Sequence, residues 1–255
     1  IPILFPLSWI REYLSLKNSD HIIVMSNYMK KILIKFFPII NQKKIFISKI
    51  GIDTQFLRKS KKIKKNFISQ KEIIKILTVR RLEPRMGLDN LIRAIYLLKK
   101  KFNINNINLN IVGKGSLKSE LKNLIYDLKL EKNIFLKGFM RKKNLIDIHY
   151  KSHIFVMPTL ELEGFGIASI QAASTGLPVV STNAGANKEV IGKYFPDLVC
   201  NDSKDYHQLA KKIYKCIKNY EVKKKNIPDK IKNDYSWDII IDNLIKVIKK
   251  NSEKI

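Results

Sequence analysis

The chain is poor in the residues that form disulfides and metal sites. Its 255 residues include two cysteines, Cys200 and Cys216, and four histidines. Neither cysteine has a partner motif for metal, so we expect both to be reduced residues of the core, as is typical of a cytoplasmic protein. His149, His153 and His207 lack the spacing to a second candidate that a metal site or a catalytic pair needs. The sequence therefore predicts no metal centre.

Long apolar runs are absent too. No stretch approaches the roughly 20 uninterrupted apolar residues that span a bilayer. The first residue is Ile1 rather than methionine, and no charged leader, apolar core and cleavage site mark a secretory precursor. We expect a fragment or a chain that has lost an N-terminal part, with a length that suits one large domain or one domain with part of another. The expected location is the cytoplasm, in solution or bound peripherally at the inner face of the membrane.

Acidic residues are scarce. There are 22 of them against 49 lysines and arginines, which gives a net charge of +27. Such a field favours nucleic acid, anionic membrane surfaces or phosphorylated substrates. Isoleucine, lysine and asparagine dominate throughout, however, so the main expected cause is a compositional bias that scatters lysine over solvated faces. Nucleic-acid modules interleave aromatic and basic residues on one strand face or carry a recognition helix, and neither pattern occurs. We predict no nucleic-acid partner and keep peripheral contact with an anionic membrane as an open alternative.

From residue 73 onward, apolar strands alternate with amphipathic helices. This alternation predicts an α/β fold with a doubly wound parallel sheet. The expected strands are 74–79, 109–112, 134–136, 154–157, 178–180 and 198–200, and the expected helices are 88–98, 117–130, 145–150 and 206–217. Before them we expect a helix at 9–16, strands at 20–25 and 45–50, and a helix that starts near 27 with Ser26 as its cap; a last helix follows Ser236.

The most informative stretch runs from residue 157 to 190. A strand ends at Met157, Glu163 stands in the following turn, and Gly164-Phe165-Gly166 leads into a helix of small residues. In a βαβ unit, ligands sit at the carboxyl ends of the strands. Glycines let the backbone approach a ligand, and the helix start offers free N–H groups to an anion. A carboxylate can accept hydrogen bonds from neighbouring hydroxyls, so Glu163 favours a hydroxyl-rich ligand.

These motifs occur in an order found in a known family. The chain resembles family 4 (group 1) retaining glycosyltransferases of the GT-B fold, mainly their C-terminal nucleotide-sugar-binding domain. The resemblance implies a pair of glutamates eight positions apart: the first, near the donor sugar, falls on Glu163, and the second, which holds the ribose hydroxyls, falls on Gln171. The motifs that carry it are E-G-F-G at 163–166, Q-A-A at 171–173, G-L-P-V-V at 176–180 and G-A-N-K-E at 185–189.

An arginine-rich loop follows the first strand of the alternation, at residues 80–87. A guanidinium there can bind two phosphate oxygens at once. The loop resembles the family's arginine-and-lysine loop for the donor diphosphate: the arginine matches Arg81, and the usual lysine position holds Met86, where the neighbouring Arg85 can supply the charge. We expect Arg80 to be an ordinary surface arginine.

Other positions are weaker candidates. Gly113, in a glycine turn before a helix, is a candidate for a second backbone contact to the ligand. Phe139 lies in the stretch 136–140, which by resemblance supports the base of the nucleotide, with an ordinary strand end as the open alternative. Lys188 and Glu189 cap or solvate a helix as readily as they bind a ligand.

The resemblance also implies how such a site works. Arg81 and Arg85, together with the N–H groups from Gly164 to Ile167, would stabilise the negative charge that develops on the β-phosphate. Glu163, which we expect to be exposed in a cleft, would hold sugar hydroxyls and favour the positive charge that grows at the anomeric carbon.

As a whole, the resemblance implies a retaining hexosyltransferase that uses a UDP- or GDP-linked sugar, without a cofactor or a metal. The acceptor would be a glycan or a lipid-linked molecule in cell-surface polysaccharide biosynthesis. Two alternatives stay open. One is a nucleotide-sugar-binding module without transfer activity. The other is a nicotinamide-dependent enzyme, although no G-x-G-x-x-G follows the first strand.

The expected domains follow the same order. Residues 1–57 would be the remnant of a Rossmann-like, N-terminal acceptor-side domain, and 58–72 a lysine-rich linker. Residues 73–235 would form the nucleotide-sugar-binding domain, and 236–255 a helix that packs back towards the N-terminal domain. We expect the chain to fold from about residue 73 to 219, to expose apolar surface at both ends, and to bind nucleotide sugar without transferring it.

Overall fold

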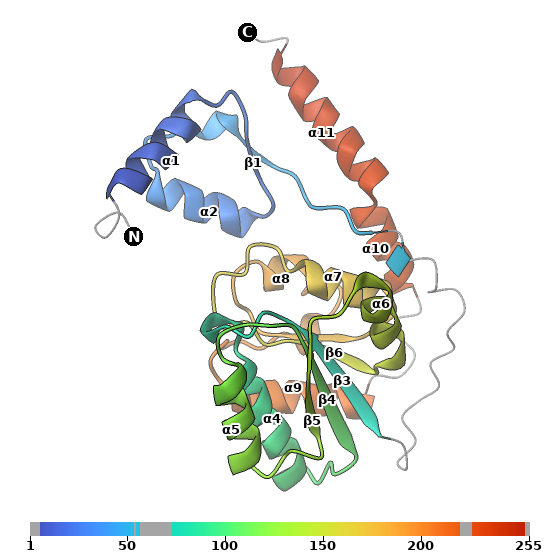
Figure 1. Ribbon diagram of the computed structural model, residues 1–255. Coiled ribbons are helices and arrows are strands. Elements are labelled where there is room, and N and C mark those ends of the chain that lie inside the picture. Colours follow the sequence, from blue (N-terminus) through green and yellow to red (C-terminus); the bar gives the residue numbers. More distant parts are fainter. Residues whose placement is uncertain (1–5, 54, 57–72, 220–225, 253–255) are drawn as a thin grey trace.

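The computed structural model describes residues 6–53, 55–56, 73–219 and 226–252, which form a larger and a smaller body (Figure 1). The larger body is built on a five-stranded sheet with the strand order β5-β4-β3-β6-β7. Every neighbouring pair of strands runs parallel, so the predicted doubly wound parallel sheet is confirmed. The strands are β3 (Ile74–Val79), β4 (Ile107–Val112), β5 (Ile134–Gly138), β6 (Ile154–Met157) and β7 (Val179–Ser181).

Helices cover both faces of this sheet, as Figure 1 shows. Strands of a parallel sheet are buried on both sides, and all residues of β6 are accordingly buried. The leucines and isoleucines that fall at helical spacing in α4 are buried in the same core, as predicted. On one face lie α4 (Leu88–Lys100), α5 (Lys118–Asp127) and α9 (Tyr206–Asn219), and on the other α6 (Lys142–Lys151) and α7 (Ile167–Ser174).

The strand order reverses between β3 and β6. From β3 the chain builds outward through β4 to β5, and it then crosses back to place β6 on the other side of β3. Open α/β sheets bind ligands outside the carboxyl ends of the strands at such a reversal. The loops after β3 and β6 contain Arg80 and Glu163, so the topology brings together two segments that are far apart in the sequence.

The smaller body combines a two-stranded parallel sheet with two helices. It has an apolar cluster of its own that includes Ile22, Val24 and Ile45. That this body is the remnant of an acceptor-side domain stays a prediction, and the linker predicted at 58–72 lies outside the described residues. Its elements are α1 (Pro6–Asn18), β1 (Ile22–Val24), α2 (Asn27–Phe36), the 3-10 turn η1 (Gln42–Lys44) and β2 (Ile45–Ile47).

Two helices follow at the C-terminal end. α10 (Ile227–Tyr235) packs on α7, and α11 (Trp237–Ser252) extends away from the larger body (Figure 1). Along α11 Ile240 is buried, whereas Trp237, Ile241, Ile245 and Ile248 are between 41% and 46% exposed. No helix in the described ranges combines the length and the apolar character that a membrane span requires.

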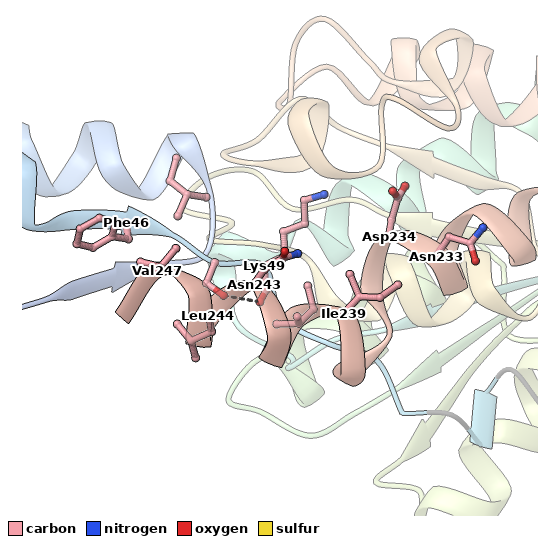
Figure 2. A pocket seen from close by; sticks show the side chains of 11 residues that line it. Phe46, Lys49, Asn233, Asp234, Ile239, Asn243, Leu244 and Val247 are labelled. Atoms are coloured by element: carbon pink, nitrogen blue, oxygen red, sulfur yellow. Dashed lines mark hydrogen bonds between the residues drawn. The ribbon is translucent and has the colours of Figure 1, made fainter. Parts of the chain in front are cut away.

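A cleft separates α11 from the segment that begins in β2 (Figure 2). It has a volume of about 340 Å³, and its lining includes Phe46 and Lys49 on one side and Asn243 and Leu244 on the other. None of its lining residues belongs to the loops after β3 and β6. It is therefore distinct from the ligand crevice that the strand order predicts.

One predicted strand, at 198–200, is wrong. The segment starts in the 3-10 turn η4 (Pro196–Leu198) and joins the sheet only through a single bridge between Val199 and Ser181. Pro196 has no N–H to give to a strand ladder, and its fixed φ favours the turn. The sequence patterns also miss the short helix α8 (Asn187–Val190) and α10.

Candidate active site

The loops after β3 and β6 lie against each other at the edge of the sheet. The Leu160 N–H donates to the Arg85 carbonyl at 2.9 Å, and Arg85 Nη1 donates to the Leu162 carbonyl at 3.1 Å. Gly87 has a left-handed φ of 65°, and a Cβ there would collide with the carbonyl oxygen of Pro158. Only glycine combines that backbone conformation with so close an approach. These contacts hold the arginine loop beside the acidic turn.

The expectation that Arg80 lies on the surface is wrong. Its side chain is 9% exposed, and its Nη2 forms an ion pair with Oε2 of Glu163. Nη2 also donates to Thr159 Oγ1 at 2.7 Å, and Thr159 Oγ1 donates to the same Glu163 oxygen at 3.1 Å. Glu163, expected to be exposed, has a side chain that is only 12% exposed, because Arg80 and Thr159 cover it. The cause is topological, since Arg80 directly follows β3 and the neighbouring β6 leads to Glu163.

The charge of this pair follows from its surroundings. Burial lowers the pKa of Arg80 from its ordinary value, the Glu163 carboxylate raises it, and the nearby Arg85 and Arg81 lower it further. A guanidinium starts from so high a pKa that it remains protonated at neutral pH. The site thus holds a permanent positive charge beside a carboxylate, which suits a ligand that carries both phosphates and hydroxyls.

Free N–H groups line the start of α7. Gly166 is the N-cap, with a left-handed φ of 82°, and the helix begins at Ile167. Among the described residues, none of the N–H groups from Gly164 to Ile167 finds an acceptor. Such groups, together with the helix dipole, favour an anion. The Phe165 side chain turns into the core against Tyr235, so Phe165 can offer a ligand only its backbone.

The glycine turn after β4 supports the arginine loop from the side opposite β6. The Gly113 N–H donates to the Gly138 carbonyl at 2.8 Å. Gly113 has a φ of 146°, and a Cβ there would collide with the carbonyl oxygen of Arg80. Farther along the turn, the hydroxyl and the N–H of Ser116 donate hydrogen bonds to Glu83 of the arginine loop, which lower the pKa of Glu83. Gly113 therefore lies beside the arginine loop and fixes its start.

The other predicted site residues lie around this edge. Arg81 is exposed, and its charge acts on both Arg80 and Glu83. Phe139, just after β5, is 69% exposed, and Lys114 Nζ lies 6.0 Å from the centre of its ring. Gln171 is half-buried on α7. The structure thus brings the arginine loop and Glu163 into direct contact, but gives neither Phe139 nor Gln171 a contact with that pair in the described part of the chain.

The smaller body reaches the site through the N-terminus of α2. Ser26, the N-cap of α2, donates to the Gly164 carbonyl at 2.7 Å. The Glu189 carboxylate accepts hydrogen bonds from the N–H groups of Asn27 at 2.9 Å and Tyr28 at 3.3 Å. Glu189 therefore caps a helix, which is one of the roles that the sequence left open, although that helix belongs to the smaller body. No local sequence pattern could have predicted this contact, because its partners are more than 160 positions apart.

The cysteines lie away from this site. Cys200 and Cys216 are buried free thiols, as predicted, and burial raises the pKa of Cys200 to about 12. A thiol with so high a pKa is a poor nucleophile at neutral pH. Over the ranges that the structure describes, no group of three histidine, cysteine, aspartate or glutamate residues could hold a metal ion.

Known proteins are similar in sequence to this chain. Residues 59–233 match the family model for glycosyl transferases group 1. An uncharacterized glycosyltransferase of Methanocaldococcus jannaschii is 26% identical over 246 residues, which cover 93% of this chain and 62% of the relative. The gpi3 subunit of phosphatidylinositol N-acetylglucosaminyltransferase from Schizosaccharomyces pombe is 24% identical over 179 residues, which cover 70% of this chain and 39% of the relative. The chain thus spans less than two thirds of either relative's length.

The fold is shared as well. The crystal structure of HepE from Anabaena, in complex with UDP and glucose, has a TM-score of 0.79 at 17% identity, and the match covers 98% of this chain and 68% of HepE. At such low identity the likeness establishes the fold, whereas the family model, which spans more than half of the chain, establishes the family. This chain belongs to the group 1 glycosyltransferase family and has the fold of the GT-B glycosyltransferases.

Proposed function

We propose that the chain binds a UDP- or GDP-linked sugar at the edge formed by the loops after β3 and β6, and that the protein transfers a hexose from it with retained configuration. The observation that carries this proposal is the meeting, where the strand order reverses, of the arginine loop, the Glu163 carboxylate and the free N–H groups of α7. Positive charges and N–H groups match the diphosphate, and the carboxylate matches the sugar hydroxyls.

The proposed mechanism divides the charges between the two loops. When the bond to the anomeric carbon breaks, negative charge grows on the β-phosphate, and Arg81, Arg85 and the N–H groups of α7 stabilise it. Glu163 holds sugar hydroxyls and favours the positive charge at the anomeric carbon. It need not act as a covalent nucleophile, because the paired-carboxylate geometry of retaining glycoside hydrolysis is not required for this role. We propose that the reaction needs no cofactor and no metal.

We further propose a glycan or lipid-linked acceptor and a role in cell-surface polysaccharide biosynthesis, at the inner face of the membrane. The name of the S. pombe relative, a subunit of phosphatidylinositol N-acetylglucosaminyltransferase, supports a lipid-linked acceptor. The net charge of +27 supports contact with an anionic surface. The complex of HepE with UDP and glucose supports a UDP-linked donor.

A nucleotide-sugar-binding role without transfer is the second candidate, and the two positions that depart from the expected signature, Gln171 and Met86, favour it. Membership of the glycosyltransferase family removes the nicotinamide-dependent alternative. Both candidate functions require binding of a nucleotide sugar, which calorimetric titration with UDP-glucose and GDP-mannose tests. If the chain binds neither of these two ligands, both candidate functions are contradicted. A transfer assay with lipid and oligosaccharide acceptors then separates them, since multiple turnovers by the 255-residue chain would overturn the binding-only role.

Arg81→Ala should weaken binding of UDP by about 10-fold or more, because a hydrogen bond to a charged group contributes roughly 1.5 to 3 kcal/mol. Binding of uridine, which lacks the phosphates, should change by less than about 2-fold. Calorimetry with both ligands provides the measurement, and Arg93→Ala, which removes an exposed arginine of α4, is the matched control. Equal losses for UDP and uridine would mean that Arg81 supports the loop rather than the phosphates.

Gln171→Glu should tighten UDP binding by about 5-fold, because a charged acceptor strengthens hydrogen bonds from the ribose by about 1 kcal/mol. The gain should vanish with 2′,3′-dideoxy-UDP, which has no ribose hydroxyls to donate. Calorimetry with the two nucleotides makes this comparison. If the gain is absent, or is equal for both nucleotides, Gln171 does not face the ribose.

A further inference from the structure

The buried guanidinium of Arg80 has more hydrogen-bonding capacity than the protein uses. A guanidinium carries N–H donors on every nitrogen. Its contacts to described residues are all made by Nη2, which reaches Glu163 Oε2, Thr159 Oγ1 at 2.7 Å and Met86 Sδ at 3.1 Å. Nε is buried and finds no acceptor among those residues. Buried polar groups normally have partners, so an unused donor on a side chain that is 9% exposed points to a ligand.

The charges around Arg80 also call for an anion. Those that act on it come from Glu163, Arg85 and Arg81. Two further guanidinium groups thus act on Arg80, whereas only one carboxylate does, which leaves a surplus of positive charge that Glu163 does not neutralise. Arg85 already donates to the Leu162 carbonyl, and Arg81 lies at the exposed rim. Arg80 is the arginine in contact with the carboxylate, and a phosphate bound to it would lie next to the group that receives the sugar hydroxyls.

The side chains at positions 80 and 86 of the arginine loop meet at their ends. Met86 is buried, and its Sδ lies 3.1 Å from Arg80 Nη2. A longer, charged side chain at position 86 would therefore place its cation where the Arg80 guanidinium now lies. In this chain the cation at that place comes from residue 80 instead.

We propose that Arg80 is the principal contact to the phosphate that carries the sugar, and that donor binding moves Arg80 from Glu163 onto that phosphate and Glu163 onto the sugar hydroxyls. The inference rests on the proposed function, and it assigns to Arg80 the main share of a role that was predicted for Arg81 and Arg85. The β-phosphate and the sugar are joined directly in a nucleotide sugar, as Arg80 and Glu163 are joined in the site. No bond to the protein forms, and Arg80 stabilises the charge of the leaving group.

Two substitutions in the pair should have opposite effects on UDP binding. Arg80→Met should weaken it by about 10- to 100-fold, because a charge-assisted contact is lost, and should change uridine binding by less than about 2-fold. Glu163→Gln should tighten UDP binding, because it frees Arg80 and removes a negative charge. An ion pair that serves only the fold would weaken binding in both variants. Calorimetry with the 255-residue chain measures these affinities, with Arg93→Met as the control on α4.

A double variant moves the positive charge from position 80 to position 86 and completes the test. Arg80→Met/Met86→Lys should recover UDP affinity to within about 5-fold of the wild type. Arg80→Lys keeps the charge but loses the planar guanidinium, so it should also weaken UDP binding. It is the variant to measure if Arg80→Met does not fold. The inference is overturned if Arg80→Met or its replacement binds UDP normally or more tightly, or loses UDP and uridine alike. If the wild-type chain binds neither UDP nor GDP, the proposed function fails and this inference fails with it. If the wild-type chain binds UDP and a folded Arg80 variant binds it equally well, the inference alone is refuted.

Discussion

Glu163→Gln should lower the rate of sugar transfer by the full-length gene product by about 100- to 1000-fold, the range typical of losing one transition-state electrostatic contact. The amide keeps the size of the side chain but loses the charge that favours the positive anomeric carbon. Glutamine is a sharper test than alanine, because Glu163 and Arg80 are both nearly buried, and truncation would leave the Arg80 charge unpaired. Turnover at saturating nucleotide sugar, with the melting temperature, provides the measurement.

The matched control lies two positions away. Glu161 is exposed in the same turn, so Glu161→Gln removes a carboxylate without disturbing the pair and should leave turnover unchanged. Transfer by the Glu163→Gln variant at a near-normal rate would contradict the assignment of Glu163. So would an equal loss in both variants, since that would reflect the charge of the loop as a whole.

Gly113→Ala should reduce the free energy of unfolding by about 4 kcal/mol, whereas Gly138→Ala should reduce it by only about 1 to 2 kcal/mol. Both glycines have positive φ, 146° at Gly113 and 67° at Gly138. A Cβ on Gly113 would collide with the Arg80 carbonyl, but a Cβ on Gly138 would meet nothing within 4 Å. The difference between the variants therefore combines the cost of the collision with that of a φ at Gly113 that L residues adopt less readily than the φ at Gly138.

Urea unfolding followed by circular dichroism measures both losses. Gly113→Ala should also weaken UDP binding in whatever fraction remains folded, because it displaces the residue that begins the arginine loop. Gly138 serves as the matched control for this effect as well. Equal destabilisation by the two substitutions would show that the turn after β4 does not hold Arg80 in place.

The helices and strands that have strong local sequence patterns could be predicted from the sequence. The bounds of β3 and β6 are those predicted, because each is a short apolar run between polar turns. α4 follows from leucines and isoleucines at helical spacing. The strand expected at 198–200 fails because the same apolar residues follow Pro196, which favours a turn. The spacing of apolar residues alone does not show that a preceding proline favours a turn over a strand.

The candidate site was predictable only in part. The order of motifs placed Glu163 and the arginine loop at strand ends, and both lie there. The burial of Arg80 was not predictable from its neighbours in the chain, because its partner Glu163 is 83 positions away and meets it only through the pairing of β3 with β6. One signal was available: Arg80 is nearer than Arg81 to the end of the strand, and hence to the sheet edge.

Amide hydrogen exchange, with and without a saturating nucleotide sugar, tests most directly the claim that the donor binds at the edge formed by the loops after β3 and β6. We expect slower exchange from Gly164 to Ile167, whose N–H groups have no acceptor in the described structure, and in the loop at 80–87. Exchange in the cleft between β2 and α11 (Figure 2) should not change. Protection confined to that cleft, or no protection of the two loops when calorimetry detects binding, would contradict the claim.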